Sequence, residues 1–270
     1  MTGSSSSSNA KKPIRLPVSF KEKVWGADDL FPWFPAANGK IGEVWFEGDL
    51  PLLVKFVFTT EALSVQVHPD DAFAQAHEKS LGKTEMWYVL RAEEGARVAI
   101  GLRESTTPEQ LRAAAQNGTI EGMLNWMEAK QGDAFFIPAG TIHAIGAGLA
   151  MCEIQQNSDI TYRLYDYGRP RELHLDKAIK VASTEASKAA PTTLPVDCKY
   201  FHVELARITT TIDYPTPGKL FHLLVFAGGM GIIAGQPFRE GETWLVPADA
   251  DPFSIRPQEP TKFLRAWSPE

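Results

Sequence analysis

Short apolar runs, separated by Gly, Pro, Asp and Asn, recur along most of the first half of this chain. The runs are Gly42–Phe46, Leu52–Phe58, Leu63–Val67, Met86–Leu90, Val98–Ile100, Ala134–Ile137, Ala144–Ile145 and Ala150–Ile154. Brief apolar segments bounded by turn residues are typical of the many short strands of a sandwich or barrel. The pattern therefore predicts a mainly β protein.

Helical patterns interrupt the strands at a few places. Asp70–His77 has acidic residues in its first turn and stops before a glycine, as helices commonly do. Thr107–Asn117 begins with a threonine N-cap followed by a proline at the first helical position. A shorter helix is predicted over Glu121–Met127. The last two form a small helical insertion at about residues 103–128.

One phrase occurs twice. Gly132–Ala139 and Gly241–Ala248 both read Gly, acid, three residues, Ile or Val, Pro, Ala, and each follows an apolar run, Trp87–Leu90 or Leu223–Phe226. An internal duplication accounts for this repeat. The alternative is that the phrase is a generic turn–strand–turn sequence with no common origin.

These patterns divide the chain into four parts. Residues 1–12 are Ser-rich and predict a disordered leader, which lacks the apolar core of a signal peptide. Residues 13–182 form a first half with the helical insertion, and residues 183–195 are a Ser-, Thr- and Pro-containing connector. Residues 196–270 form a second half. We expect two related β-barrel halves, of which the second is degenerate.

Composition restricts the class of protein. The chain has 270 residues, 44% of them apolar and 22% charged, as in an ordinary globular protein with a sizeable core. Its net charge of −6 argues against nucleic-acid binding but not against an anionic small molecule. No run approaches the length of a membrane span. The two cysteines form no framework, which indicates a reducing cytoplasm.

Four side chains have the chemistry of metal ligands: Gln66, His68, Glu85 and His143. Nitrogen and oxygen donors without thiolates suit Zn²⁺ or a similar divalent ion in a catalytic site. Residues two apart in a strand face the same side, so Gln66 and His68 project together, as do Lys83 and Glu85. The alternative is that the two histidines are ordinary, with backbone carbonyls as partners.

The second half lacks this set. When Trp87–Leu90 is matched to Leu223–Phe226 and Gly132–Ala139 to Gly241–Ala248, Phe221 falls at the position of Glu85 and Pro252 at that of His143. Neither side chain binds metal. We therefore expect one metal ion per chain, held by the first half.

At this point the residues resemble a known family. The stretch Gly132–His143 is similar to the cupin β-barrel signature, and the larger set resembles type I mannose-6-phosphate isomerases in their short bacterial form. The matching phrases are Val24–Gly26, Ile41–Trp45, Ser64–Asp71, Gly82–Leu90, Ile137–Ala144 and Glu153–Arg169. They follow the family's order over most of residues 20–180. The second half resembles the family only in its degenerate barrel, and the chain is shorter than typical members.

The resemblance implies two jelly-roll (cupin) halves and a zinc-dependent enzyme that interconverts mannose 6-phosphate and fructose 6-phosphate. It implies that the zinc ligands are Gln66, His68, Glu85 and His143. It places Arg163 at the family's active-site arginine, Lys83 at a lysine beside the metal, and Asp159 at an active-site aspartate. The expected partner is a small sugar phosphate, and the sequence indicates no oligomeric state.

Two cations have alternative roles. Lys83 is either a base that removes the proton during aldose–ketose isomerisation or a fixed cation for a phosphate or hydroxyl group. Arg163 either stabilises charge that develops in the reaction or braces Asp159 or Asp166 as a structural ion pair.

Two further residues are candidates for substrate binding. Ser64 faces the same side as Gln66 by strand parity, and the alternative is a solvated hydroxyl at the strand end. Glu43 lies between Gly42 and Val44 in a predicted strand, and it is a candidate to contact the residues that surround the metal ligands.

Two other functions fit the same fold. One is a cupin that binds sugar without turnover, although such a binder does not need a Lewis acid. The other is an iron-dependent cupin oxygenase, in which two histidines and one carboxylate suffice and Gln66 would be superfluous.

Overall fold

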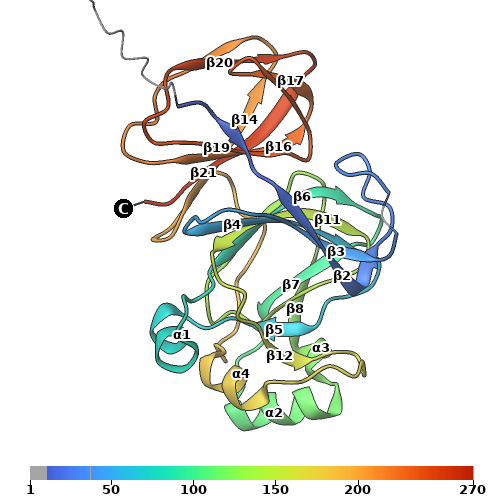
Figure 1. Ribbon diagram of the computed structural model, residues 1–270. Coiled ribbons are helices and arrows are strands. Elements are labelled where there is room, and N and C mark those ends of the chain that lie inside the picture. Colours follow the sequence, from blue (N-terminus) through green and yellow to red (C-terminus); the bar gives the residue numbers. More distant parts are fainter. Residues whose placement is uncertain (1–10, 37, 270) are drawn as a thin grey trace, which may run out of the picture. The chain divides into compact units, whose positions relative to one another are not determined.

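The protein, as a computed structural model, is described over residues 11–36 and 38–269, and it divides into two compact units (Figure 1). One unit comprises residues 17–201. The other comprises residues 202–269 and the described part of residues 1–16. Most of the predicted leader lies outside the described residues. Among the described residues, no helix has the length and apolar character needed to cross a membrane.

Two open antiparallel sheets build the unit of residues 17–201. The six-stranded sheet has the order β2-β3-β4-β11-β6-β9, with β2 Val18–Ala27, β3 Ile41–Phe46, β4 Leu52–Thr59, β11 Leu149–Gln156, β6 Glu85–Ala92 and β9 Ala134–Ile137. The five-stranded sheet has the order β12-β5-β10-β7-β8, with β12 Tyr162–Tyr165, β5 Val65–Val67, β10 His143–Ile145, β7 Arg97–Leu102 and β8 Leu124–Glu128.

Apolar side chains from both sheets share one buried cluster. Trp87, Val89 and Phe135 come from the six-stranded sheet, and Val98 and Ile145 come from the five-stranded sheet. Each of these side chains is at most 2% exposed. Removing this much apolar surface from water is the main stabilising contribution to such a unit. The inner faces of the two sheets therefore enclose a core, and charged residues on these faces are the exceptions to explain.

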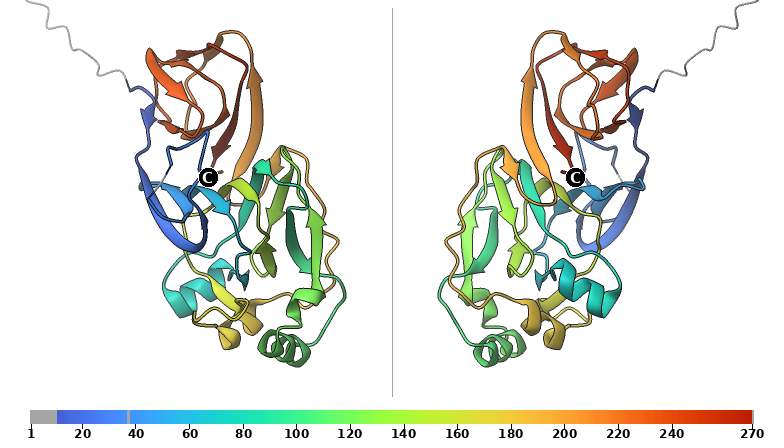
Figure 2. Two further views of the ribbon diagram at one scale, coloured as in Figure 1. Left: turned by 90° about the vertical axis from the view of Figure 1, so that its right-hand side faces the viewer. Right: turned by 90° about the vertical axis from the view of Figure 1, so that its left-hand side faces the viewer.

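Helices cover the other face of the five-stranded sheet. Its outward residues, such as Val65 and Ala144, pack in a second cluster with Leu111 and Ala178 of the helices. The helices are α1 Asp71–Glu78, α2 Pro108–Asn117, α3 Ile120–Met123 and α4 Leu175–Val181. Figures 1 and 2 show α1, α2 and α4 gathered beside β5 and β12.

Most predicted elements of the first half are confirmed. Each apolar run coincides with a strand, and Ala134–Ile137 coincides with β9 at both ends. Asp70 caps α1 by accepting a hydrogen bond from the backbone N–H of Phe73, 2.8 Å away. Thr107 and Gln110 form a capping box at α2. These ends were predictable because capping depends on neighbouring residues alone.

One predicted helix is wrong. Glu121–Met127 was expected to be helical, but helix α3 ends at Met123 and Leu124–Glu128 forms β8. The backbone groups of β8 pair with those of β7, with Val98 opposite Met127 and Ala99 opposite Trp126. Long-range pairing thus overrides a short local preference. The apolar pattern also missed β2, β12 and α4.

Two open sheets also build the other unit. One has the order β1-β19-β16-β21-β14, with β1 Ile14–Arg15, β19 Thr243–Val246, β16 His222–Gly228, β21 Thr261–Trp267 and β14 His202–Ile208. The other has the order β15-β20-β17-β18, with β15 Ile212–Tyr214, β20 Phe253–Pro257, β17 Met230–Ile233 and β18 Gln236–Arg239. Their shared cluster includes Leu224, Phe226 and Ile255. A two-residue strand, β13 (Val196–Asp197), precedes this unit in the chain.

Both units contain the same strand order and the same hydrogen-bond pattern. The order β4-β11-β6-β9 in one matches β14-β21-β16-β19 in the other. The N–H of Val89 donates to the carbonyl of Asp133 and its carbonyl accepts from Gly132, both at 2.9 Å. Phe226 makes the same two bonds with Glu242 and Gly241, at 2.9 and 2.8 Å. Val89 therefore corresponds to Phe226.

This correspondence differs by one residue from the match predicted from the sequence. With Val89 matched to Phe226, Glu85 corresponds to His222 and not to Phe221. The pairings agree, since Glu85 lies opposite Ile137 of β9 and His222 lies opposite Val246 of β19. The predicted position of Phe221 is therefore wrong by one residue, and in a strand a shift of one residue exchanges the two faces.

Candidate metal centre

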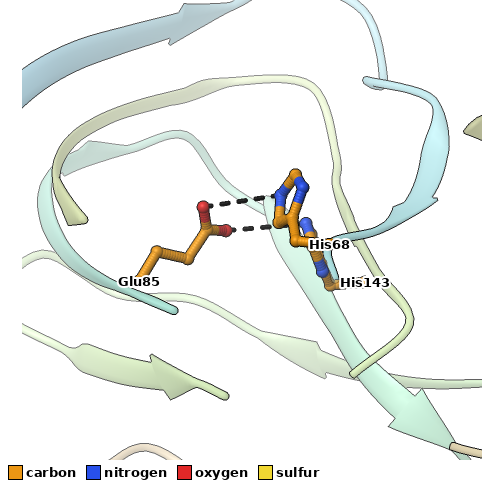
Figure 3. Close-up of side chains that lie close together, drawn as sticks. All are labelled: His68, Glu85 and His143. Atoms are coloured by element: carbon orange, nitrogen blue, oxygen red, sulfur yellow. Dashed lines mark ion pairs between the residues drawn. The ribbon is translucent and has the colours of Figure 1, made fainter. Parts of the chain in front are cut away.

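Three side chains that could bind a metal, from separate parts of the chain, converge between the two sheets of the larger unit. His68 follows β5, Glu85 begins β6 and His143 begins β10. Figure 3 shows the carboxylate of Glu85 directed at both imidazoles. Its Oε2 lies 3.6 Å from His68 Nε2 and its Oε1 lies 3.5 Å from His143 Nε2. One potential ligand atom from each residue lies within 4.8 Å of the others.

The backbone sets the tautomer of both histidines. His68 Nδ1 donates to the carbonyl of Ile160 at 2.7 Å, and His143 Nδ1 donates to that of Thr141 at 2.9 Å. A carbonyl only accepts, so in each neutral ring the proton is on Nδ1 and the lone pair of Nε2 faces Glu85. A backbone partner on one nitrogen and a free lone pair on the other is the usual arrangement of a metal-binding histidine.

Burial makes this arrangement costly without a cation. His68, Glu85 and His143 are at most 1% exposed. His68 Nε2 and Glu85 Oε1 have no hydrogen-bond partner, and Glu85 Oε2 lies 3.0 Å from the ammonium of Lys83. Burial lowers the pKa of His143 to about 4, and burial also lowers the pKa of His68. Burial and the nearby Glu153 raise the pKa of Glu85. Two neutral imidazoles and a poorly solvated carboxylate fit a divalent cation.

Gln66 lies beside these ligands as strand parity predicted. It is directly opposite His143 in the pairing of β5 with β10, and its Nε2 lies 3.2 Å from His143 Nε2. Its Oε1 accepts a hydrogen bond from the buried hydroxyl of Ser64 at 3.2 Å. Rotating the amide by 180° would exchange these two atoms and place the oxygen next to His143. Ser64 therefore faces the site and is not a solvated strand end.

A buried chain of alternating charges adjoins the ligands. Lys83 Nζ lies 3.0 Å from Glu85 Oε2 and 3.6 Å from Glu153 Oε1, and Lys55 Nζ lies 3.5 Å from Glu153 Oε1. The indole N–H of Trp87 donates to Glu153 Oε2 at 3.0 Å. Burial alone would raise the pKa of Glu153, but the two lysines and Trp87 outweigh it and lower the pKa. Each ion is thus paired, as buried charges must be.

Glu153 and Lys55 were not recognised as site residues from the sequence. A usable signal was present, because each is a charged residue within an otherwise largely apolar strand, β11 or β4. They lie opposite one another in the pairing of these strands. Residues directly opposite in a sheet share a face, so both project inward with Glu85.

Arg163 lies beside the site in the strand pairing, and its guanidinium forms no ion pair with a carboxylate among the described residues. It lies opposite Gln66 in the pairing of β12 with β5. Its guanidinium donates to the carbonyl of Glu172 at 2.7 Å, and its buried Nε has no partner. Asp166 pairs instead with Arg171, through two contacts of 2.6 Å. Neither structural ion pair considered for Arg163, with Asp159 or with Asp166, is therefore present among the described residues.

The two remaining acidic candidates lie farther from the ligands. Asp159 has a side chain that is 68% exposed, and its Oδ1 lies 3.7 Å from Lys55 Nζ. Glu43 accepts a hydrogen bond from the indole of Trp45 at 2.9 Å and lies 3.4 Å from Lys23. The ring of Trp45 lies 4.4 Å from Lys55 Nζ. Asp159 thus contacts Lys55 directly, and Glu43 reaches Lys55 through the ring of Trp45.

Known proteins with similar sequences and structures are named mannose-6-phosphate isomerases. No family model matches the chain. It is 32% identical to mannose-6-phosphate isomerase ManA of Bacillus subtilis over 90% of this chain and 96% of that one. It is 37% identical to mannose-6-phosphate isomerase of Streptococcus mutans, over 73% and 68%. A crystal structure of the Bacillus subtilis mannose 6-phosphate isomerase superposes with a TM-score of 0.85 at 27% identity, over 95% and 99%.

Proposed function

This chain belongs to the mannose-6-phosphate isomerase family, and from that premise we propose that it interconverts mannose 6-phosphate and fructose 6-phosphate with one zinc ion per chain. The observation that carries the proposal is the buried convergence of His68, Glu85 and His143, with one potential ligand atom of each within 4.8 Å of the others and His68 Nε2 left without a hydrogen-bond partner (Figure 3). Gln66 is the proposed fourth and weaker ligand, because a neutral amide oxygen binds such an ion less firmly than an imidazole or a carboxylate.

The charges around the ligands suit an anionic substrate. Lys55 and Lys83 balance Glu85 and Glu153, so these four groups sum to zero and a divalent ion would leave the site positive. The ion would supply a Lewis acid for the sugar carbonyl and for the oxyanion that forms by proton transfer. Arg163, with its unpartnered buried Nε, is the proposed protein group that adds to this stabilisation.

The groups around the ligands have proposed roles in binding. Ser64 is buried beside Gln66, where its hydroxyl can bind a substrate hydroxyl. Asp159, which is largely exposed and 3.7 Å from Lys55, is proposed to contact the substrate. Glu43 is proposed to influence substrate binding indirectly, because its contacts are with Trp45 and Lys23.

Lys83 is proposed to act as a fixed cation, because its ammonium lies between the carboxylates of Glu85 and Glu153. In the Lys83→Arg variant we expect measurable kcat, about 1–10% of the wild-type value, since a guanidinium retains the charge. Lys83→Met should lose about 10³-fold or more, within the range for one electrostatic group. Steady-state kinetics with metal content checked for each variant is the measurement. Equal loss in both variants would support the alternative role as the base.

The second unit is proposed to be a degenerate copy of the first and to bind no metal. By register, His222 corresponds to Glu85. In the facing sheet Ile255 lies opposite Ile233 as His143 lies opposite Ile100, and Ile212 lies opposite Ile255 as Gln66 lies opposite His143, so the proposed counterparts of Gln66 and His143 are apolar. Arg265 and Glu204 correspond to Glu153 and Lys55, with the two charges exchanged. The repeated strand order and the shared turn hydrogen bonds support two related cupin-type halves.

Metal counting tests this assignment. We expect one zinc per chain by elemental analysis, and the same value in His202→Ala and His222→Ala, because neither histidine belongs to a group of converging ligands among the described residues. Loss of one metal equivalent in either variant would place a second ion in this unit.

A coupled isomerase assay on mannose 6-phosphate decides the function as a whole. Wild-type protein should turn over, lose activity on chelator treatment and regain it with added Zn²⁺. Binding of the sugar phosphate without turnover would favour a sugar-binding cupin, and oxygen consumption with Fe²⁺ would favour an oxygenase. The proposed location is the cytoplasm, and both cysteines are free thiols, as a reducing compartment would leave them.

A further inference from the structure

A buried hydrogen-bond network connects the three chain segments that carry the ligands. Its centre is Gln156, the last residue of β11, whose side chain is buried and points away from the metal centre, opposite in parity to Glu153. The sequence motifs that predict the metal ligands assign no role to the side-chain amide of Gln156.

Gln156 holds the backbone of Thr84, the residue between Lys83 and Glu85. Its Oε1 accepts a hydrogen bond from the N–H of Thr84 at 2.9 Å, and its own N–H donates to the carbonyl of Thr84 at 3.1 Å. Thr84 is 4% exposed, so water cannot readily replace these partners. Both backbone groups of the residue between two site side chains are therefore bound by one glutamine.

Asp71 orients the amide of Gln156. Its Oδ1 accepts from Gln156 Nε2 and from the N–H of Gly82, both at 2.9 Å, and its Oδ2 accepts from the hydroxyl of Tyr200 at 2.8 Å. Gly82 packs so closely here that an added Cβ would lie 2.5 Å from the backbone of Asp70 and Asp71. The start of α1, just after His68, is thus joined to the segment that leads into Glu85.

Thr84 extends the network to the third ligand segment. Its hydroxyl accepts from the N–H of Ala139 at 3.2 Å, and the next residue, Gly140, donates its N–H to the carbonyl of His68 at 2.8 Å. These residues form the turn that leads into His143. A displacement of Thr84 would consequently move Glu85 relative to both histidines.

We propose that Gln156 is a positioning residue that sets the geometry of the metal centre through Thr84, with Asp71 as its orienting partner. The inference rests on the proposed metal-dependent function. Partners of this kind, one step removed from the ligands, commonly change metal affinity by 10–100-fold when they are removed.

The test compares Gln156→Met, which keeps the side-chain volume but loses the amide, with a matched control. Thr59→Val is the control, because the buried hydroxyl of Thr59 likewise donates once at 2.8 Å and accepts once at 3.0 Å in the same strand pair. It lies at the opposite end of that pair, about 20 Å away. Metal-free proteins are titrated with Co²⁺ and with Zn²⁺, and the visible absorption of bound Co²⁺ reports the coordination geometry.

We expect Gln156→Met to bind both ions about 10–100-fold more weakly and to change the Co²⁺ spectrum. Thr59→Val should show a comparable fall in Tm with unchanged affinity and spectrum. Asp71→Asn, which keeps Oδ1 for Gly82 and Gln156, should bind within about threefold of wild type, and Asp71→Ala should bind more weakly than Asp71→Asn.

Wild-type affinity and an unchanged spectrum in Gln156→Met, together with a lowered Tm, would overturn the proposal and leave Gln156 a purely structural residue. If Gln156→Met does not fold, the comparison of Asp71→Ala with Asp71→Asn decides, and equal affinities would overturn it. Failure of the wild-type protein to bind either ion would instead reject the proposed metal-dependent function.

Discussion

Replacing His143 with alanine is expected to remove metal binding and isomerase activity together. His143 Nε2 faces Glu85 in a fully buried site, and the turn before it fixes the ring. Loss of an indirect partner costs 10–100-fold in metal affinity, so loss of a direct ligand should cost more than about 100-fold. Zn²⁺ titration of the metal-free protein and the coupled assay at saturating mannose 6-phosphate are the measurements.

His77→Ala is the matched control, since His77 is an exposed histidine of the same unit that packs on Phe73. It should retain full metal and activity. A stoichiometric, tightly bound metal in His143→Ala would show that the ion lies elsewhere. Normal turnover after complete loss of the metal would show that the metal has no part in the reaction.

Replacing Arg163 with alanine is expected to lower kcat by about 10²–10³-fold, with a smaller rise in KM and unchanged metal content. A group that stabilises charge formed only in the transition state affects kcat more than substrate binding. Arg163 suits this role, because it faces Gln66 across the strand pair and its Nε has no partner. Arg163→Lys should recover only part of the loss, because an ammonium lacks the planar set of donors.

Arg112→Ala provides the control, since Arg112 forms a partly exposed ion pair with Asp176, 2.8 Å long, on the helical side of the same unit. Its kinetics should equal those of wild type. If Arg163→Ala folds, keeps zinc and turns over normally, the proposed role in catalysis is wrong. If it unfolds where Arg163→Lys does not, the bond to the carbonyl of Glu172 is its main contribution.

Local features of the fold were predictable from the sequence. Helices α1 and α2 begin where their N-caps do, because a capping side chain reaches only two or three residues along the chain. The apolar runs marked the strands because alternation and turn residues are also local. By contrast, Leu124–Glu128 forms a strand only because β7 offers its backbone groups as partners, and nothing within five residues encodes that.

The same division applies to the site. Gln66, His68, Glu85 and His143 were identifiable because donor chemistry and strand parity belong to short segments. Their convergence required the pairing of β5 with β10 and the facing of two sheets, which bring together residues up to 77 positions apart.

The surroundings of the ligands depended on tertiary structure still more strongly. Glu153 and Lys55 become a pair only in the register of β4 and β11. The register of β16 with β19 likewise moved the counterpart of Glu85 from Phe221 to His222.

The sequence by itself thus determined the strand-rich composition, the cap of α2 and the set of candidate ligands, because each depends on residues that are close along the chain. Only the tertiary structure decided the charge balance at the metal centre, the bonds of Gln156 to Thr84 and Asp71, and the freedom of Arg163 from a carboxylate. The physical reason is that burial and hydrogen bonding act between groups that are close in space. Spatial proximity is set by strand register, which is a property of the whole sheet.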